Sequence, residues 1–224
     1  ERVGNVDDAF ANAAITADAT YSTDFVSHAQ LEPQGVLVSA ANDKVEVWTS
    51  SQTPVFITAN LAKLLNVSPK KITVHQVRGG GGFGRRAQLS HVAEATQVAV
   101  ATNKTIKLVW TRENDVQNGW FRQASVMQIN AGIDERGLVT AWDAARAGGD
   151  LAPHTMARIL PGALPSVPKG INDLLVDATE SIFDGWVIDG GGVEGLVDDY
   201  DFPNKQLRHA SVNHGLPLAA WRSV

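Results

Sequence analysis

Hydrophobic and polar residues alternate over several short segments in the first two thirds of the chain, which is typical of half-buried β-strands. The segments are 19–25, 35–39, 44–49, 71–77 and 105–111. Asn42 and Asp43, between two of them, predict a hairpin turn. A second hairpin is expected where 124–134 and 138–145 flank a polar turn ending at Gly137, and a last strand is expected near 205–212.

Two other segments repeat apolar residues at helical spacing. One begins at Pro54, a residue favoured in the first helical turn, and stops near Asn66, and the other covers 87–101. Beyond Gly148, four prolines between positions 153 and 168 and a glycine run at 190–192 predict an irregular segment. We expect an α+β fold with both helices packed on one face of a mixed sheet, organised as a region 1–148 followed by a region 149–224.

The amino-acid composition and the net charge exclude several classes of function. The 224 residues are 44% hydrophobic and 19% charged, as in an ordinary globular chain. The net charge is −5 and no segment is strongly basic, so we expect no nucleic-acid partner. No apolar run is long enough to predict a membrane span. The absence of Cys excludes thiolate nucleophiles and cysteine-ligated metal centres.

Four consecutive glycines at 79–82, followed by Phe83, Gly84, Arg85 and Arg86, separate a predicted strand from a predicted helix. Backbone without Cβ atoms can approach a ligand closely, its N–H groups can converge on an anion, and the two arginines can add charge. A tight turn with a solvated arginine pair is the alternative. A nucleotide hydrolase is disfavoured because the loop lacks a Gly-Lys-Ser/Thr ending.

Two histidine–glutamate pairs are weaker candidates for a catalytic or metal-binding site. His28 and Glu32 could form an acid–base pair or bind a metal, or could hold a polar corner by local hydrogen bonds. His91 and Glu94, three positions apart on a predicted helix, favour a solvated ion pair. No metal site is predicted from the protein's own side chains, and no serine lies in a Gly-x-Ser-x-Gly nucleophile elbow.

Several segments together, in order, carry a resemblance to a known family. They are His-Ala-Gln-Leu-Glu-Pro at 28–33, Val-Glu-Val-Trp at 45–48, Ser-Gln-Thr-Pro at 51–54, Gly-Gly-Gly-Phe-Gly-Arg-Arg at 80–86, Lys-Leu-Val-Trp-Thr-Arg-Glu at 107–113, Asp-Glu-Arg-Gly at 134–137 and the closing 215–224. The chain resembles the molybdenum-binding large subunit of the xanthine oxidase/aldehyde oxidase family. Within it, the chain is similar to isoquinoline 1-oxidoreductase β subunits and membrane-bound aldehyde dehydrogenases.

The resemblance implies a molybdopterin-binding domain and a molybdenum cofactor, in its cytosine dinucleotide form. It implies cofactor contacts from Gln52 and from the loop residues Gly81, Gly82, Phe83, Gly84 and Arg85. Arg222 would lie on the substrate side. The family's catalytic base is a Glu outside this chain, so no catalytic residue is assigned here.

The implied reaction hydroxylates an aldehyde or N-heteroaromatic carbon with an oxygen from water and passes electrons to a small [2Fe–2S] subunit. Purines are disfavoured, because Arg85, Arg86 and Ala87 stand where purine-oxidising relatives have Gly-Lys-Glu. We expect the chain to be a portion of a longer large subunit, inactive by itself. The alternative is a non-catalytic binding or scaffold fragment with an anion-binding glycine loop. The resemblance is compatible with the bacterial periplasm or the cytoplasm.

Overall fold

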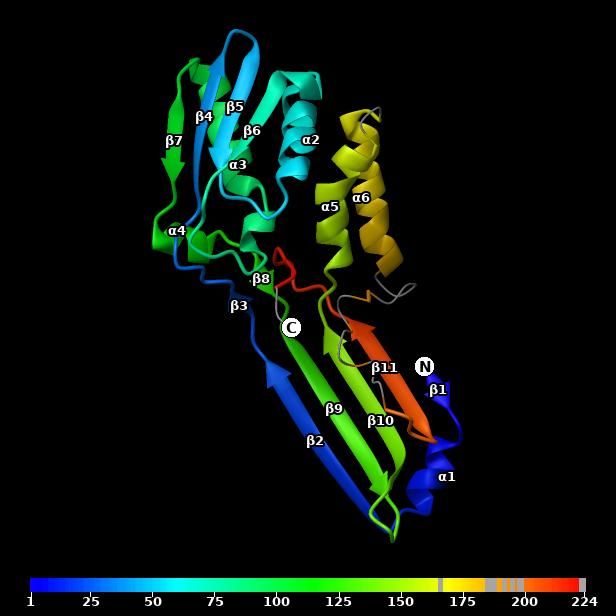
Figure 1. Cartoon of the computed structure of the whole chain (residues 1–224). Coiled ribbons are helices and arrows are strands. Elements are labelled where there is room, and N and C mark those ends of the chain that lie inside the picture. Colours follow the sequence, from blue (N-terminus) through cyan, green and yellow to red (C-terminus); the bar gives the residue numbers. More distant parts are fainter. Residues whose placement is uncertain (165–166, 184–188, 191–192, 194–195, 197–199, 222–224) are drawn as a thin grey trace. The chain divides into compact units, whose positions relative to one another are not determined.

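The computed structural model describes the whole chain except residues 165–166, 184–188, 191–192, 194–195, 197–199 and 222–224. The chain folds into two compact units, each assembled from separate segments (Figure 1). Unit 1 comprises Glu1–Val26, Gln123–Ala152 and Ser181–Gly215, and unit 2 comprises Ser27–Arg122, Pro153–Glu180 and Leu216–Val224. The predicted division at 148/149 lies at the end of a unit 1 strand and stays a prediction.

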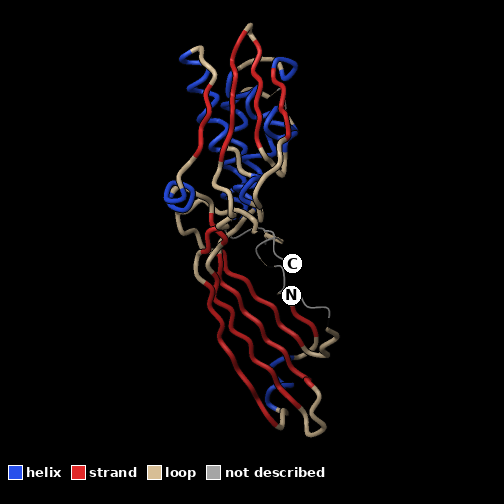
Figure 2. The backbone as a smooth tube through the Cα atoms, turned by 60° about the vertical axis from the view of Figure 1, so that its left-hand side comes forward, coloured by secondary structure: helices blue, strands red, loops and turns tan. Residues whose placement is uncertain are grey.

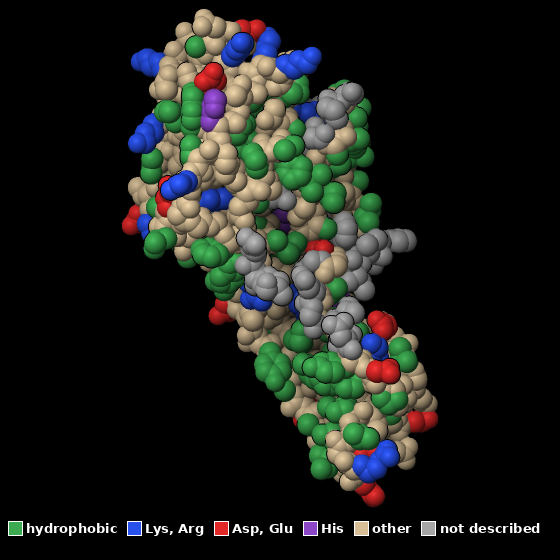
Figure 3. All heavy atoms as spheres, viewed as in Figure 1, with side chains coloured by type: hydrophobic (Ala, Val, Ile, Leu, Met, Phe, Trp, Pro, Cys, Tyr) green, Lys and Arg blue, Asp and Glu red, His purple; other side chains and the backbone are tan. Residues whose placement is uncertain are grey.

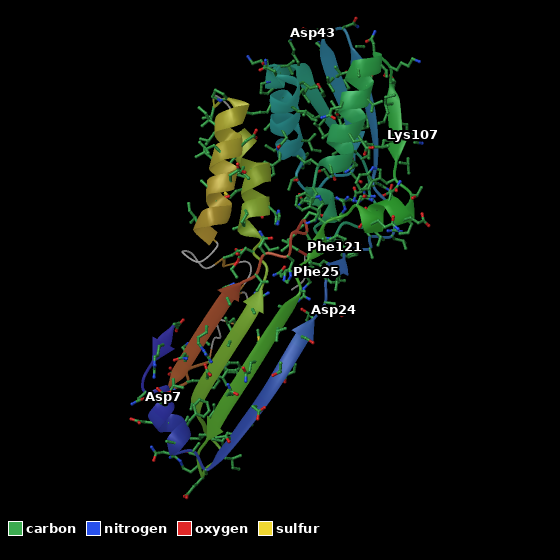
Figure 4. The ribbon with its side chains drawn as sticks, turned by 180° about the vertical axis from the view of Figure 1, so that it is seen from behind. Asp7, Asp24, Phe25, Asp43, Lys107 and Phe121 are labelled. Carbon is green, nitrogen blue, oxygen red and sulfur yellow. The ribbon has the colours of Figure 1, made fainter. Side chains whose placement is uncertain are left out.

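Unit 2 contains a four-stranded sheet with the order β6-β5-β4-β7. The strands are β4 (Gly35–Ala41), β5 (Lys44–Thr49), β6 (Ile72–Gln76) and β7 (Ile106–Val109). The β4–β5 hairpin is confirmed, since Asn42 and Asp43 at its tip have φ of 52° and 61°, the sign that a type I′ turn needs. Asp43 marks this tip in Figure 4. β5 and β6 are parallel, so their carboxyl ends lie at the same edge.

Helices α2 (Pro54–Leu65) and α3 (Ser90–Thr102) pack against this sheet and share one hydrophobic core with it. The core includes Val38, Val47, Ile57, Leu61, Val92 and Ala99. Buried strand residues alternate with more exposed ones, so the core lies on one face, as expected (Figure 2). α3 begins three residues later than predicted because residues Arg85–Ala87 form a short 3-10 turn and Gln88 is extended.

Unit 1 is built on a five-stranded sheet with the order β1-β11-β10-β9-β2 (Figure 2). Its strands are β1 (Arg2–Val3), β2 (Ile15–Thr23), β9 (Ser125–Ile133), β10 (Val139–Gly148) and β11 (Lys205–Ser211), with helix α1 (Val6–Ala11) between β1 and β2. The predicted β9–β10 hairpin and the last strand are confirmed. Val193, Leu196 and Leu207 pack with Ala144 on β10.

The segment after Gly148 is not irregular throughout. It forms helices α5 (Ala152–Ala163) and α6 (Lys169–Phe183). Prolines suggested a loop, but Pro153 occupies the first turn of α5 and Pro168 precedes α6, and both positions tolerate proline. Apolar residues gather along α6 and are exposed there, at Ile171, Leu174, Leu175 and Ile182 (Figure 3).

The remaining short elements are β3 (Val26–Ser27), the 3-10 turn Pro69–Lys71, α4 (Arg112–Gln117) and β8 (Phe121–Arg122). The α+β class is confirmed. Within the described residues, no helix is both long enough and apolar enough to cross a bilayer.

Candidate functional site

A cavity of about 390 Å³ lies in unit 2 at the carboxyl ends of β5 and β6. Loops that follow neighbouring parallel strands meet at one sheet edge, which is where ligands bind in many α/β proteins. The cavity is lined by Ser50, Ser51, Gln52, Gln76, Gly79, Gly81, Gly82, Phe83 and Arg86. Gln52 and the glycine loop therefore meet as expected, and the Gly84 N–H donates to Gln52 Oε1 at 3.0 Å.

Contacts within the chain account for most of the loop's glycines. A Cβ at Gly79 would lie 2.6 Å from Ser50 Cβ, and one at Gly80 would lie 2.7 Å from Glu32 Cβ. One at Gly82 would lie 2.6 Å from Gln52 Oε1. Real Cβ atoms do not pack this closely, so each glycine lets the loop lie directly against another segment of its own unit. The structure thus shows close approach of these glycines to the protein itself, and their expected close approach to a ligand stays a prediction.

Three successive backbone N–H groups of the loop remain unused. Among the described residues, the N–H groups of Gly81, Gly82 and Phe83 have no acceptor, although those on either side do: Gly80 donates to Glu32 and Gly84 to Gln52. The φ of Gly81 is +91° and that of Phe83 is +51°. Consecutive N–H groups in such a backbone form an anion-binding concavity. All three residues line the cavity.

Arg86 lines the cavity but is almost fully buried, at 4% exposure. Its guanidinium donates to Gly81 O, to Ser50 Oγ and to Glu32, whose carboxylate forms an ion pair with it at 3.0 Å. Burial lowers the pKa of Arg86, and the charge of Glu32 opposes that shift. The alternative interpretation, in which this arginine is solvated, is therefore wrong for Arg86, which is an internal structural group.

Arg85 lies away from the cavity lining, in the interior of unit 2. It is 1% exposed, pairs with Asp115 at 3.3 Å and stacks over Trp110 at 5.3 Å. Gln30 donates to the same Asp115 carboxylate. Burial lowers the pKa of Arg85 and the nearby Asp115 raises it. Its expected part in cofactor binding stays a prediction. Its contacts with Asp115 and Trp110 hold the residue that follows the glycine loop in the interior.

The expected ion pair between His91 and Glu94 is wrong. His91 faces inward on α3 and is 2% exposed, beside Trp110, whereas Glu94 accepts from the Trp110 indole N–H at 3.0 Å. Burial, together with Arg85 and Arg86, lowers the pKa of His91 to about 3. His91 is therefore neutral at physiological pH.

His28 and Glu32 contact different groups. The His28 ring nitrogens lie 3.1 Å from Trp120 O and 3.2 Å from Ala220 O, whereas Glu32 binds the Gly80 N–H and Arg86. Burial lowers the pKa of His28. Both side chains bond within the protein, as the polar-corner interpretation expects, but their partners lie far away in sequence, so the expected local hydrogen bonds are wrong. The part of the chain that the structure describes holds no cluster of three metal-ligating side chains. Arg222 falls outside the described residues.

Four residues in or beside the site were not assigned to it from sequence. They are Glu32, Ser50, Ser51 and Gln76. Ser50 and Gln76 stand at the carboxyl ends of two adjacent parallel strands, and that position was a usable signal. The contacts of Arg86 with Glu32 join positions far apart in sequence, and a single sequence carries no local signal for them.

A family model described as "Molybdopterin cofactor-binding domain" matches residues 1–157. The chain is 31% identical over 136 residues to isoquinoline 1-oxidoreductase subunit beta of Brevundimonas diminuta, which covers 60% of this chain and 17% of that protein. It is 30% identical over 176 residues to the aldehyde oxidoreductase molybdenum-binding subunit PaoC of Escherichia coli (strain K12), covering 78% of this chain and 23% of the relative. The chain thus spans less than a quarter of these relatives.

Solved structures share the fold. The aldehyde oxidoreductase from Desulfovibrio gigas superposes with a TM-score of 0.69 at 17% identity, covering 99% of this chain and 22% of that one. The CO dehydrogenase from Oligotropha carboxidovorans gives a TM-score of 0.67 at 17% identity, covering 99% of this chain and 25% of that one. At this identity the likeness concerns the arrangement of the backbone.

Proposed function

Because the chain belongs to the molybdopterin cofactor-binding domain family, a family of molybdenum-containing oxidoreductases, we propose that the cavity between Gln52 and the glycine loop holds the cofactor. One observation carries this proposal. Three consecutive N–H groups, those of Gly81, Gly82 and Phe83, line the cavity with no acceptor in the described part of the chain. Such a set of donors suits a group that carries negatively charged oxygens.

The rest of the cavity fits an anionic, oxygen-rich cofactor. Its lining adds the side chains of Gln52 and Ser50, together with Gln76 and Ser51, whose polar groups already bond within the chain. None of the lining residues is Asp or Glu. The chain has no Cys to offer a metal, which agrees with a cofactor whose own dithiolene binds the molybdenum. When bound, this cofactor supplies two-electron redox chemistry.

We further propose residue roles within this function. Gln52 orients the cofactor with its side-chain amide while accepting from the Gly84 N–H. Gly81, Gly82 and Phe83 donate backbone N–H groups, and Arg85 supports the loop from behind through Asp115. Arg222 belongs to the substrate side. The cofactor is the cytosine dinucleotide form of molybdopterin.

The whole protein then hydroxylates an aldehyde or N-heteroaromatic carbon with an oxygen from water and transfers electrons to a [2Fe–2S] subunit. The base that this reaction needs is a Glu in another part of the large subunit. This chain contributes binding and orientation, and by itself it is inactive.

A second candidate is a non-catalytic fragment that binds an anion at the same loop. The observation that favours it is the packing of Gly79, Gly80 and Gly82 against their own chain, which explains these glycines without any cofactor.

An activity assay separates the two candidates. We would produce the large subunit that carries this chain together with its iron–sulfur partner, and measure oxidation of an aldehyde and of isoquinoline with a dye acceptor. Gln52→Ala should lower turnover at least about tenfold, as expected when one hydrogen-bonding group at a reaction centre is lost. Glu46→Gln, on an exposed carboxylate of β5, is the matched control. Equal turnover in Gln52→Ala and wild type would favour the non-catalytic role.

A further inference from the structure

The guanidinium of Arg86 uses every nitrogen on the protein itself. Nε donates to Gly81 O at 2.5 Å, Nη1 to Ser50 Oγ at 2.6 Å, and Nη2 to both Glu32 O at 2.8 Å and Glu32 Oε2 at 3.0 Å. Although Arg86 lines the cavity, only 4% of it is exposed. Each of its three nitrogens thus donates at least one hydrogen bond within the chain.

Glu32 binds the glycine loop from the other side. Its carboxylate accepts from the Gly80 N–H at 2.5 Å and from Arg86, and its backbone N–H donates to Gly80 O at 3.1 Å. A Cβ at Gly80 would meet Glu32 Cβ at 2.7 Å, so the two backbones lie in direct contact. Glu32 thus fixes the peptide groups immediately before Gly81.

The backbone of Arg86 also fixes the opposite wall of the cavity. Arg86 O accepts from the Gln52 N–H at 3.0 Å and from Ser51 Oγ at 3.2 Å. One residue therefore binds the glycine loop with its side chain and the Gln52 loop with its carbonyl.

We propose that Arg86 and Glu32 form a positioning clamp that holds the glycine loop so that the N–H groups of Gly81, Gly82 and Phe83 face the cavity. In this arrangement Arg86 acts on the cofactor through the backbone, and its own charge is compensated by Glu32. The identity of the ligand rests on the proposed function. The hydrogen bonds of the clamp itself are present in the structure without a ligand.

A direct-charge role and a positioning role predict opposite effects of Glu32→Gln. If Arg86 attracted the cofactor by its charge, removal of the competing carboxylate would strengthen binding. If Arg86 and Glu32 position the loop, the same change removes the charge from the oxygen that accepts from both Arg86 and Gly80, which weakens these hydrogen bonds and therefore weakens binding. Arg86→Lys retains the charge but loses the planar fork, so positioning predicts that it behaves like Glu32→Gln.

The first test needs no cofactor. Amide hydrogen exchange of the 224-residue chain, followed by NMR, should show the Gly80 amide exchanging about tenfold faster in Glu32→Gln, as expected when a charge-assisted hydrogen bond becomes a neutral one. Amides of β4 and β5 should keep their rates, and Glu46→Gln should match wild type throughout. Unchanged Gly80 exchange in both Glu32→Gln and Arg86→Lys would overturn the clamp.

The second test measures molybdenum per chain by mass spectrometry, in the large subunit purified from a host that makes molybdopterin. Both variants should carry at most about a tenth of the wild-type molybdenum, the equivalent of one lost charge-assisted hydrogen bond. Wild-type loading in Arg86→Lys, or increased loading in Glu32→Gln, would contradict the clamp. Wild-type protein without molybdenum would instead contradict the proposed function, and the exchange measurement would still decide on the clamp.

Discussion

Gly84 lies where a side chain has no room. Its φ is +99°, and a Cβ there would lie 2.0 Å from the carbonyl oxygen of Ala220. The Gly84 N–H also donates to Gln52. Gly84 thus determines the backbone conformation, the packing and one hydrogen bond of the candidate site. The effect of its substitution on stability can be compared with that of another glycine.

We expect Gly84→Ala to lower the free energy of unfolding by about 3 kcal/mol, the sum of a left-handed conformation and a forced contact. Gly170→Ala is the control, because Gly170 lies in α6 with nothing within 4 Å of its Cβ position. That change should raise stability by about 0.5–1 kcal/mol. Urea unfolding measures both. Equal effects of the two changes would show that the Gly84 contact is not tight.

His91 makes stability depend on pH. Burial and the neighbouring arginines lower its pKa from 6.5 to about 3. Between these two pH values His91 binds a proton in the unfolded chain but stays neutral in the folded chain. Its contribution is fully present above pH 6.5 and is lost as the pH falls toward 3, at about 1.4 kcal/mol per pH unit. The lowered pKa of His28 acts in the same direction.

Urea unfolding of wild type and His91→Phe at pH 7, 6 and 5 tests this dependence. The free energy of unfolding of the variant should fall less on acidification, because its unfolded chain takes up about one proton fewer than that of the wild type. His75, which is partly exposed, offers a control in His75→Phe. A His91→Phe protein with the wild-type slope would contradict a neutral, buried His91.

At the scale of elements, α2 and α3 end in the same way. Asn66 and Asn103 follow their last residues with φ of 53° and 50°, in the left-handed conformation that commonly closes a helix. Asn tolerates this conformation better than other residues with a side chain, and Gly tolerates it best.

Asn66→Ala and Asn103→Ala should therefore each cost about 1 kcal/mol of stability, whereas the corresponding Gly variants should cost nothing. Thermal unfolding followed by circular dichroism compares the pairs. Equal melting temperatures for the Ala and Gly variants at each position would show that the left-handed conformation of these residues does not stabilise the helix ends.

The elements that could be predicted are those whose signals are local. The Asn42-Asp43 turn, α2 after Pro54 and the β9–β10 hairpin all follow from short patterns. α5 and α6 could not be recognised from the same rules, because Pro153 and Pro168 indicate a loop unless the helix boundaries are already known. Periodicity alone placed the start of α3 within the turn at Arg85–Ala87.

At the scale of the whole molecule, each unit combines segments that are distant in the chain. β11 pairs in parallel with β10 in unit 1, and in unit 2 Glu32 and Arg86 meet across 54 positions. Long-range contacts of this kind leave no periodic signal. The sequence could predict that Gln52 and the glycine loop share a sheet edge, because both follow predicted strands, but not which side chains hold that edge together.

We have proposed that the N–H groups of Gly81, Gly82 and Phe83 bind the molybdenum cofactor in the cavity beside Gln52. A crystal structure of the cofactor-loaded large subunit would reveal these contacts. We expect cofactor oxygens within about 3 Å of at least two of these three nitrogens, with Gln52 in contact. A cofactor bound elsewhere, with these N–H groups facing only solvent, would contradict it.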